Sequence, residues 1–168
     1  MNKKTLYIHG LDSSPKKDKL EMIEKFSEVE ALHLDYREQP DTFKILSDLI
    51  VEKDVTHIIG SSFGGFLGFW LAEKHGIPCL LFNPALAMGA EMKHEENSNH
   101  CPRRLVVLGE RDDVVDPNVT FSFLKNHPRD KCIERVVWCN ELGHRIDTDT
   151  FWEFTNYLFQ PSVAPGSA

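Results

Sequence analysis

Short apolar runs alternate along the chain with longer stretches in which apolar residues recur every three or four positions. The short runs predict strands, and the longer stretches predict helices with one apolar face. Two runs, 79–82 and 105–108, are apolar without interruption, which is typical of central parallel strands covered on both faces. The expected strands are residues 5–8, 30–34, 55–59, 79–82, 105–108 and 134–139. The expected helices begin at residues 15, 42, 66, 119 and 149, with Ser14 and Asp41 as caps of the first two.

Strands that alternate with helices predict an α/β fold, in which a mostly parallel sheet carries helices on both faces. A chain of 168 residues is long enough for one domain with its own hydrophobic core. We assign this single domain to residues 1–160. Residues 161–168 are small residues and proline, and we expect them to form a disordered tail.

The most informative stretch is 60–65, which joins the third expected strand to the third expected helix. It contains G-x-S-x-G with Ser62 at its centre, the pattern of a nucleophile elbow. Gly60 and Gly64 provide the small residues that the sharp turn needs on each side of Ser62, and Ser61 lacks such a pair. The alternative interpretation is an ordinary Gly/Ser-rich turn between a strand and a buried helix.

A serine hydroxyl becomes a good nucleophile when a histidine takes its proton and a carboxylate orients that histidine. Asp112 and His144 follow later expected strands, and with Ser62 they keep the chain order Ser, Asp, His of α/β-hydrolases. Because the carboxyl ends of parallel strands share one edge, we expect the three to meet. Asp113 and Asp116 remain alternative acids, and a solvated acidic turn remains an alternative role for the cluster.

The reaction would also need two N–H donors for the oxyanion of the tetrahedral intermediate. We expect the backbone N–H of Phe63, which follows the nucleophile, and that of Leu11, in the loop after the first strand. Gly10 would let that loop come close to the serine, and a simple turn at Gly10 remains the alternative.

The charge and composition of the chain limit the classes of partner that it is expected to bind. The chain has 19 basic and 26 acidic residues, and its net charge of −7 argues against nucleic acids and anionic membranes as partners. No apolar run approaches the roughly 20 residues of a membrane span, and the N-terminus lacks a signal-peptide pattern, so we expect a cytoplasmic protein. His94, His100 and Cys101 match no metal-ligand spacing, and we expect neither a metal nor another cofactor.

Four motifs together resemble the YqiA/YcfP family of small bacterial esterases, which belongs to the α/β-hydrolase superfamily. They are Y-I-H-G-L-D-S-S-P at 7–15, G-S-S-F-G-G at 60–65, N-P-A at 83–85 and G-H-R at 143–145. The resemblance extends over nearly the whole chain. It implies a compact fold without a large cap domain and serine-dependent hydrolysis of esters or acyl thioesters. It also implies Ser62 as nucleophile, His144 as base and Asp112 as acid.

Our main hypothesis is therefore an esterase that works through an acyl-enzyme. A hydrolase-like module that binds a small molecule or a partner without turnover is the alternative. A nucleotide site is disfavoured, since residues 60–68 do not spell G-x-G-x-x-G and Phe66 stands where a P-loop needs lysine.

Two further expectations concern the substrate. Leu11, Phe63, Phe66 and Leu86 are candidates for an apolar acyl site. The acidic segment 91–96, within the loop 89–101, is a candidate lid that would disfavour anionic substrates.

Overall fold

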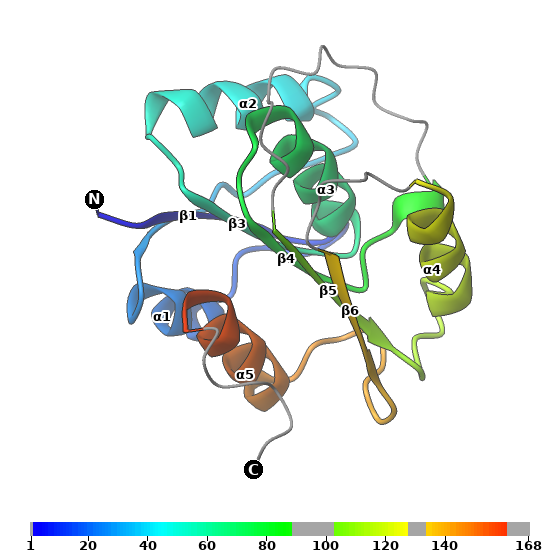
Figure 1. Cartoon of the computed structure of the whole chain (residues 1–168). Helices are drawn as coiled ribbons and strands as arrows, with labels where there is room; N and C mark the ends of the chain where they lie inside the picture. The colour runs from blue at the N-terminus through cyan, green and yellow to red at the C-terminus, as the bar shows by residue number, and fades with distance from the viewer. Residues whose placement is uncertain (1, 89–102, 128–133, 161–168) are drawn as a thin grey trace.

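The computed structural model describes residues 2–88, 103–127 and 134–160. Within these residues, parallel strands form one sheet in the order β2-β1-β3-β4-β5-β6 (Figure 1). The strands are β1 (Lys4–Ile8), β2 (Glu28–Glu30), β3 (His57–Ser61), β4 (Cys79–Phe82), β5 (Arg104–Gly109) and β6 (Glu134–Cys139).

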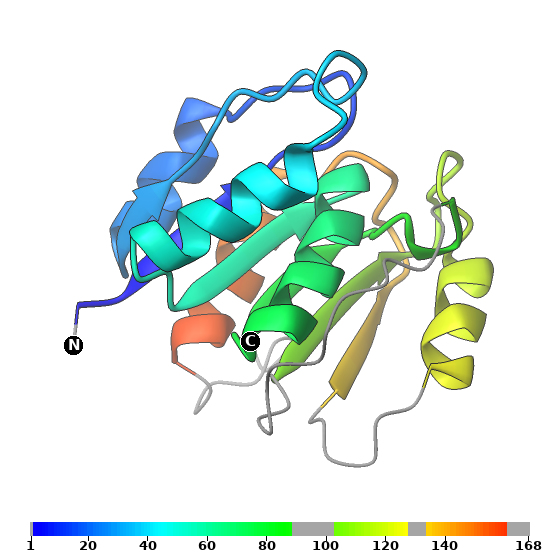
Figure 2. The same ribbon diagram turned by 90° about the horizontal axis from the view of Figure 1, so that it is seen from above.

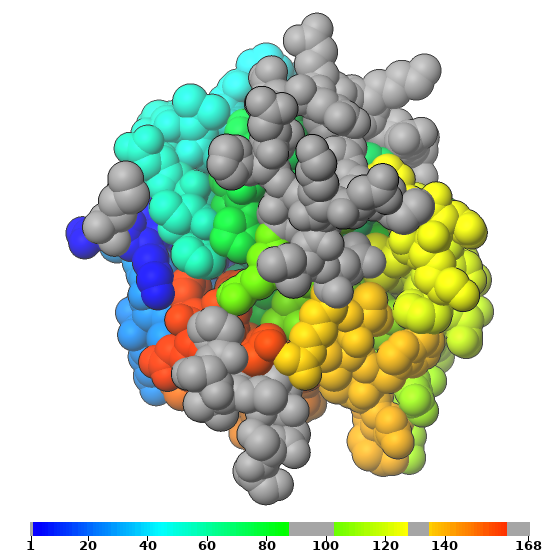
Figure 3. Space-filling model, in the orientation of Figure 1, coloured from blue at the N-terminus to red at the C-terminus, as the bar shows by residue number. Residues whose placement is uncertain are grey.

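Helices cover both faces of the sheet, so the expected α/β fold is confirmed. Helices α2, α3 and α4 lie on one face, and α1 and α5 lie on the other (Figures 1 and 2). In the space-filling view, α2 in cyan lies above α5 in orange-red (Figure 3). The helices are α1 (Lys17–Glu24), α2 (Thr42–Glu52), α3 (Phe63–His75), α4 (Pro117–Asn126) and α5 (Thr148–Phe159), with a 3-10 turn η1 (Leu86–Met88) after β4.

Strand β4 shows why the central strands are apolar without interruption. All four of its side chains are fully buried. Cys79 and Leu81 belong to the core cluster under α2 and α3, whereas Leu80 and Phe82 belong to the cluster under α1 and α5. Since successive side chains point to opposite faces, a strand with both faces covered needs apolar residues at every position.

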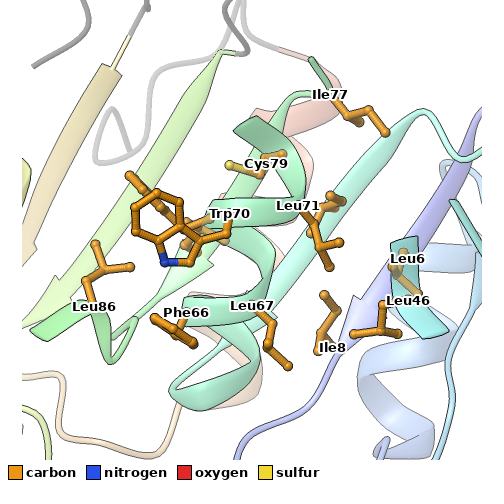
Figure 4. Close-up of a cluster of buried hydrophobic side chains, with 14 of the residues drawn as sticks. Leu6, Ile8, Leu46, Phe66, Leu67, Trp70, Leu71, Ile77, Cys79 and Leu86 are labelled. Carbon is orange, nitrogen blue, oxygen red and sulfur yellow. The ribbon is translucent and has the colours of Figure 1, made fainter. Parts of the chain in front are cut away.

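Helix α3 is the central helix of its layer and is buried on all sides from Gly64 to Glu73. Its side chains pack toward Leu46 of α2 on one side and Leu86 of η1 on the other (Figure 4). A Cβ atom on Gly64 would lie 2.2 Å from the carbonyl oxygen of Ile8 and 2.3 Å from that of His9. The glycine therefore allows a close approach of α3 to β1 that a larger residue would prevent.

A buried ion pair joins α3 to β5. The guanidinium of Arg104 donates to the carboxylate of Glu73 over 2.8 Å, and both side chains are almost completely buried. The guanidinium also lies 4.4 Å from the ring centre of Phe69, and His127 Nε2 lies 3.3 Å from a Glu73 oxygen. Removing one partner of such a pair typically costs about 3–5 kcal/mol, so the pair fixes α3 against the sheet. The sequence pattern alone did not predict it.

Several element boundaries differ from the sequence-based expectation. The second strand is Glu28–Glu30 rather than 30–34, because these residues pair with 4–6 of β1. Helix α1 begins at Lys17, with Lys16 rather than Ser14 at its N-cap. Asp41 is the N-cap of α2, but its side chain makes no capping hydrogen bond.

Several expectations lie outside the described residues. They are the disordered tail 161–168, the acidic loop 89–101 and the group His94, His100 and Cys101. None of the helices in the described ranges is long and apolar enough to cross a membrane.

We expect Gly64→Ala to lower the free energy of unfolding by about 3 kcal/mol or more, because the new Cβ would meet backbone atoms that cannot move aside. Gly143→Ala is the matched control, since its Cβ would meet only the carbonyl oxygen of Arg111 at 3.6 Å. The control should change stability by less than about 1 kcal/mol. Urea unfolding followed by circular dichroism measures both, and equal stabilities would contradict the close approach.

Candidate active site

Ser62 occupies the sharp turn between β3 and α3. Its backbone has φ 54° and ψ −120°, a conformation that a residue with a side chain rarely adopts and that costs about 1–3 kcal/mol. Strand β4 and the residues after it hold this turn in place. The N–H of Ser62 donates to the carbonyl of Phe82, and the carbonyl of Ser62 accepts from the N–H of Ala85, each over 3.0 Å.

The loop after β1 lies directly against Ser62. A Cβ atom on Gly10 would be 3.3 Å from Cβ and 3.9 Å from Oγ of Ser62. Leu11, the next residue, is 42% exposed. Phe63 is the first residue of α3, and the first N–H groups of a helix have no partner within the helix. The structure thus brings the loop of Leu11 and the N-terminus of α3 to the same serine.

Asp112 and His144 are joined by hydrogen bonds. Nδ1 of His144 lies 3.0 Å from Oδ1 and 2.9 Å from Oδ2 of Asp112. The Asp112 side chain is fully buried, and its Oδ1 also accepts from the N–H groups of Val114 and Val115, over 2.9 and 2.8 Å. Because carboxylate oxygens only accept, Nδ1 of His144 carries the proton, and Nε2 of the neutral ring is left to accept one.

The two alternative acids have other surroundings. Asp113 is exposed. Asp116 is the N-cap of α4, where its Oδ1 accepts from the N–H of Asn118 over 2.8 Å. Of the three carboxylates, it is Asp112 that the structure brings to His144. Another histidine of the sheet, His57 in β3, is half-buried, and burial lowers its pKa to about 4.

Asn83 connects the loops that carry Asp112 and His144, a role that sequence reasoning missed. It follows β4 and is 2% exposed. Its Nδ2 donates to the carbonyls of Gly143, over 2.9 Å, and His144, over 3.4 Å. Its Oδ1 accepts from the N–H of Gly109, at the end of β5, over 2.7 Å. The feature of the sequence that could have indicated this role is the position of Asn83. It directly follows an apolar strand, at the carboxyl ends of the strands, where the other polar residues of the site also lie.

His9 and Tyr36 hold the loop that carries Leu11. His9 is 1% exposed, its Nδ1 donates to the carbonyl of Gly10 over 2.8 Å, and its Nε2 accepts from the N–H of Leu34 over 3.0 Å. This arrangement requires a neutral ring, and burial lowers the pKa of His9 accordingly. The hydroxyl of Tyr36 donates to the carbonyl of His9 over 2.6 Å.

The prediction of an apolar acyl site is wrong for two of its four residues. Phe66 and Leu86 are 5% and 1% exposed and belong to the core around α3, so they cannot line an open site (Figure 4). Phe63 is half-buried, and its ring lies 4.9 Å from that of Tyr36. Among the described side chains, no group of three or more His, Cys, Asp or Glu residues is arranged to hold a metal ion.

Comparison with known proteins identifies the family. Residues 4–133 match the family described as "Uncharacterised protein family (UPF0227)". The chain belongs to this family. UPF0227 is the YqiA/YcfP family that the sequence motifs resemble.

Solved structures with the same fold include proteins named as hydrolases. A monoacylglycerol lipase from Paleococcus ferrophilus has a TM-score of 0.71 at 13% identity, covering 94% of each chain. SOBER1 from Arabidopsis thaliana has a TM-score of 0.70 at 13% identity, covering 97% of this chain and 100% of that one. A putative α/β-superfamily hydrolase from Xanthomonas campestris pv. campestris has a TM-score of 0.67 at 15% identity, covering 93% and 99%. At these identities the similarity establishes an α/β-hydrolase fold.

We expect Asn83→Asp to lower the free energy of unfolding by about 2–4 kcal/mol near neutral pH, because a carboxylate cannot donate to the carbonyls of Gly143 and His144. The loss should shrink at acidic pH, where the new carboxyl is protonated and can donate again. Asn118→Asp, at the exposed first turn of α4, is the control and should be close to neutral. Urea titrations at several pH values measure the difference; equal effects of the two substitutions would contradict the bridging role of Asn83.

Proposed function

We propose that the protein is a serine esterase that cleaves small carboxylic esters or acyl thioesters through an acyl-enzyme on Ser62. The observation that carries the proposal is the pair of hydrogen bonds from His144 to the buried carboxylate of Asp112, at the sheet edge where the strained turn of Ser62 also lies. Membership of UPF0227 and the hydrolase fold support it. The acidic composition favours a small-molecule substrate over a nucleic acid or an anionic membrane. The location that we propose is the cytoplasm.

In the first half of the reaction, Nε2 of His144 takes the proton of the Ser62 hydroxyl while Oγ attacks the substrate carbonyl. Asp112 keeps the ring in the tautomer that can accept this proton, and it stabilises the imidazolium that forms. The negative oxygen of the tetrahedral intermediate accepts from the N–H groups of Phe63 and Leu11. The N-terminal end of α3 adds a favourable partial positive charge at the same place.

The intermediate then collapses. The bond to the alcohol or thiol breaks, His144 gives its proton to the leaving group, and the acyl group stays on Ser62. A water molecule attacks the acyl-enzyme as His144 takes one of its protons. Collapse of the second intermediate returns that proton to Ser62 and releases the carboxylic acid. No cofactor takes part.

The first test is labelling with a small fluorophosphonate probe, read by intact mass. We expect one adduct on the wild type and on Ser61→Ala, and none on Ser62→Ala, because the probe reacts only with a serine activated by a nearby base. Folded wild type without an adduct would overturn the acyl-enzyme. An adduct without turnover of any ester would instead favour the alternative, a binding module of the hydrolase fold.

The second test concerns the acid. Asp112→Asn should lower kcat for a p-nitrophenyl ester by about 10³–10⁴-fold, because an amide no longer fixes the required tautomer of His144. Asp113→Asn and Asp116→Asn are matched controls, and each should stay within about threefold of wild type, since asparagine also caps helices well. A larger loss with either control than with Asp112→Asn would reassign the acid.

A further inference from the structure

A cavity of about 170 Å³ lies between the loop after β1 and the segment that follows β2. Its lining includes Leu11, Asp12 and Ser13 on one side and Asp35, Tyr36 and Arg37 on the other. The cavity is smaller than the clefts of about 300–1,000 Å³ that enclose drug-sized ligands. It can therefore receive only a small chemical group.

Both walls of this cavity are continuous with the surroundings of Ser62. Leu11 directly follows Gly10, whose added Cβ would lie 3.9 Å from Oγ of Ser62. On the opposite wall, the ring of Tyr36 lies 4.9 Å from that of Phe63, the residue after Ser62. Leu11 and Tyr36 therefore connect the cavity lining to the residues that contact or adjoin Ser62.

The charges in the lining are unequal. The guanidinium of Arg37 donates through both of its terminal nitrogens to the carboxylate of Asp12, over 2.8 Å for the Nη2 contact, and this pairing lowers the pKa of Asp12. The carboxylate of Asp35 accepts from the backbone N–H of Arg37 over 3.1 Å. The lining therefore carries two carboxylates and one guanidinium, and the terminal nitrogens of that guanidinium, which could otherwise bind a substrate carboxylate, are already paired with Asp12.

The Asp12–Arg37 pair is about 60% exposed on both partners, at 62% and 61%. Exposed pairs of this kind contribute little to folding stability. Asp12 also has φ 55°, which is uncommon for a residue with a side chain. The pair is thus a feature of the cavity wall and not of the core.

We propose that this cavity is the subsite for the substrate group next to the reacting carbonyl, and that it accepts small, uncharged groups and rejects anionic ones. The proposal rests on the proposed esterase function. Because the terminal nitrogens of Arg37 are already paired with Asp12, they are not free to bind an anionic group, and the excess negative charge of the lining repels a carboxylate or a phosphate.

The test compares two matched pairs of esters at low salt. The acyl pair is p-nitrophenyl butyrate and mono-p-nitrophenyl succinate, and the alcohol pair is phenyl acetate and 3-acetoxybenzoate. In each pair the second ester adds a carboxylate. The measured quantity is the ratio of kcat/KM for the neutral ester to that for the anionic ester, because a general effect of a substitution on catalysis cancels in this ratio.

We expect Asp12→Asn to lower this ratio by about three- to tenfold and Arg37→Gln to raise it by a similar factor, in the pair whose variable group occupies the cavity. Asp54→Asn is the matched control, because Asp54 is also exposed and has φ 53°. It precedes β3 and so lies at the amino ends of the strands, away from Ser62 at their carboxyl ends. Asparagine tolerates this backbone conformation at both positions. The pair of esters whose ratio changes shows whether the cavity binds the acyl group or the alcohol group of the substrate.

Ser13→Phe provides a second, steric test, since the phenyl ring would fill the cavity. It should raise KM for the neutral ester of the responsive pair of esters while the small fluorophosphonate still labels Ser62. Ratios and KM values unchanged in all variants, with Ser62 labelled, would overturn the subsite and leave the esterase proposal standing. No labelling of wild-type Ser62 would overturn the esterase proposal itself.

Discussion

The close approach of the first turn of α3 to the ends of β1 and β4 is the constraint on which the rest of the structure depends. Gly64 lies against the carbonyls of Ile8 and His9, and hydrogen bonds to β4 and the following residues fix both ends of the Ser62 peptide unit. Main-chain atoms make these contacts, so they cannot relax by side-chain rotation. The surrounding core offsets the strain at Ser62, which stays partly exposed while its backbone is held.

The other polar residues of the site depend on the same sheet edge. Parallel strands end together there, and the side chain of Asn83 joins the end of β5 to the loop of His144. The Glu73–Arg104 pair fixes α3 to β5 deeper in the core. The separation between the serine turn and the Asp112–His144 pair is therefore set by buried hydrogen bonds and packing, and the exposed loops contribute less to it.

The loop after β1 is held in a different way. Its contacts to the segment after β2 combine the neutral ring of His9, the hydroxyl of Tyr36 and the exposed pair of Asp12 and Arg37. These interactions add less to stability than the core does, but they shape the wall beside Ser62. The backbone on one side of Ser62 is rigid, and the loop on the other side is charged and held by side-chain hydrogen bonds. In the proposed esterase, the rigid side would fix the position of the nucleophile, and the charged loop would influence which substrates bind.

The sequence by itself determined the order of strands and helices, the sharp turn at Ser62 and the position of each polar residue after a strand, because these follow from local periodicity and from glycine spacing. Strands 79–82 and 134–139 were predicted to the residue. Only the tertiary structure decided that Asp112 is the carboxylate beside His144, that Asn83 bridges two loops, and that Phe66 and Leu86 are buried. Those outcomes depend on distances between segments far apart in the chain, which no local pattern records.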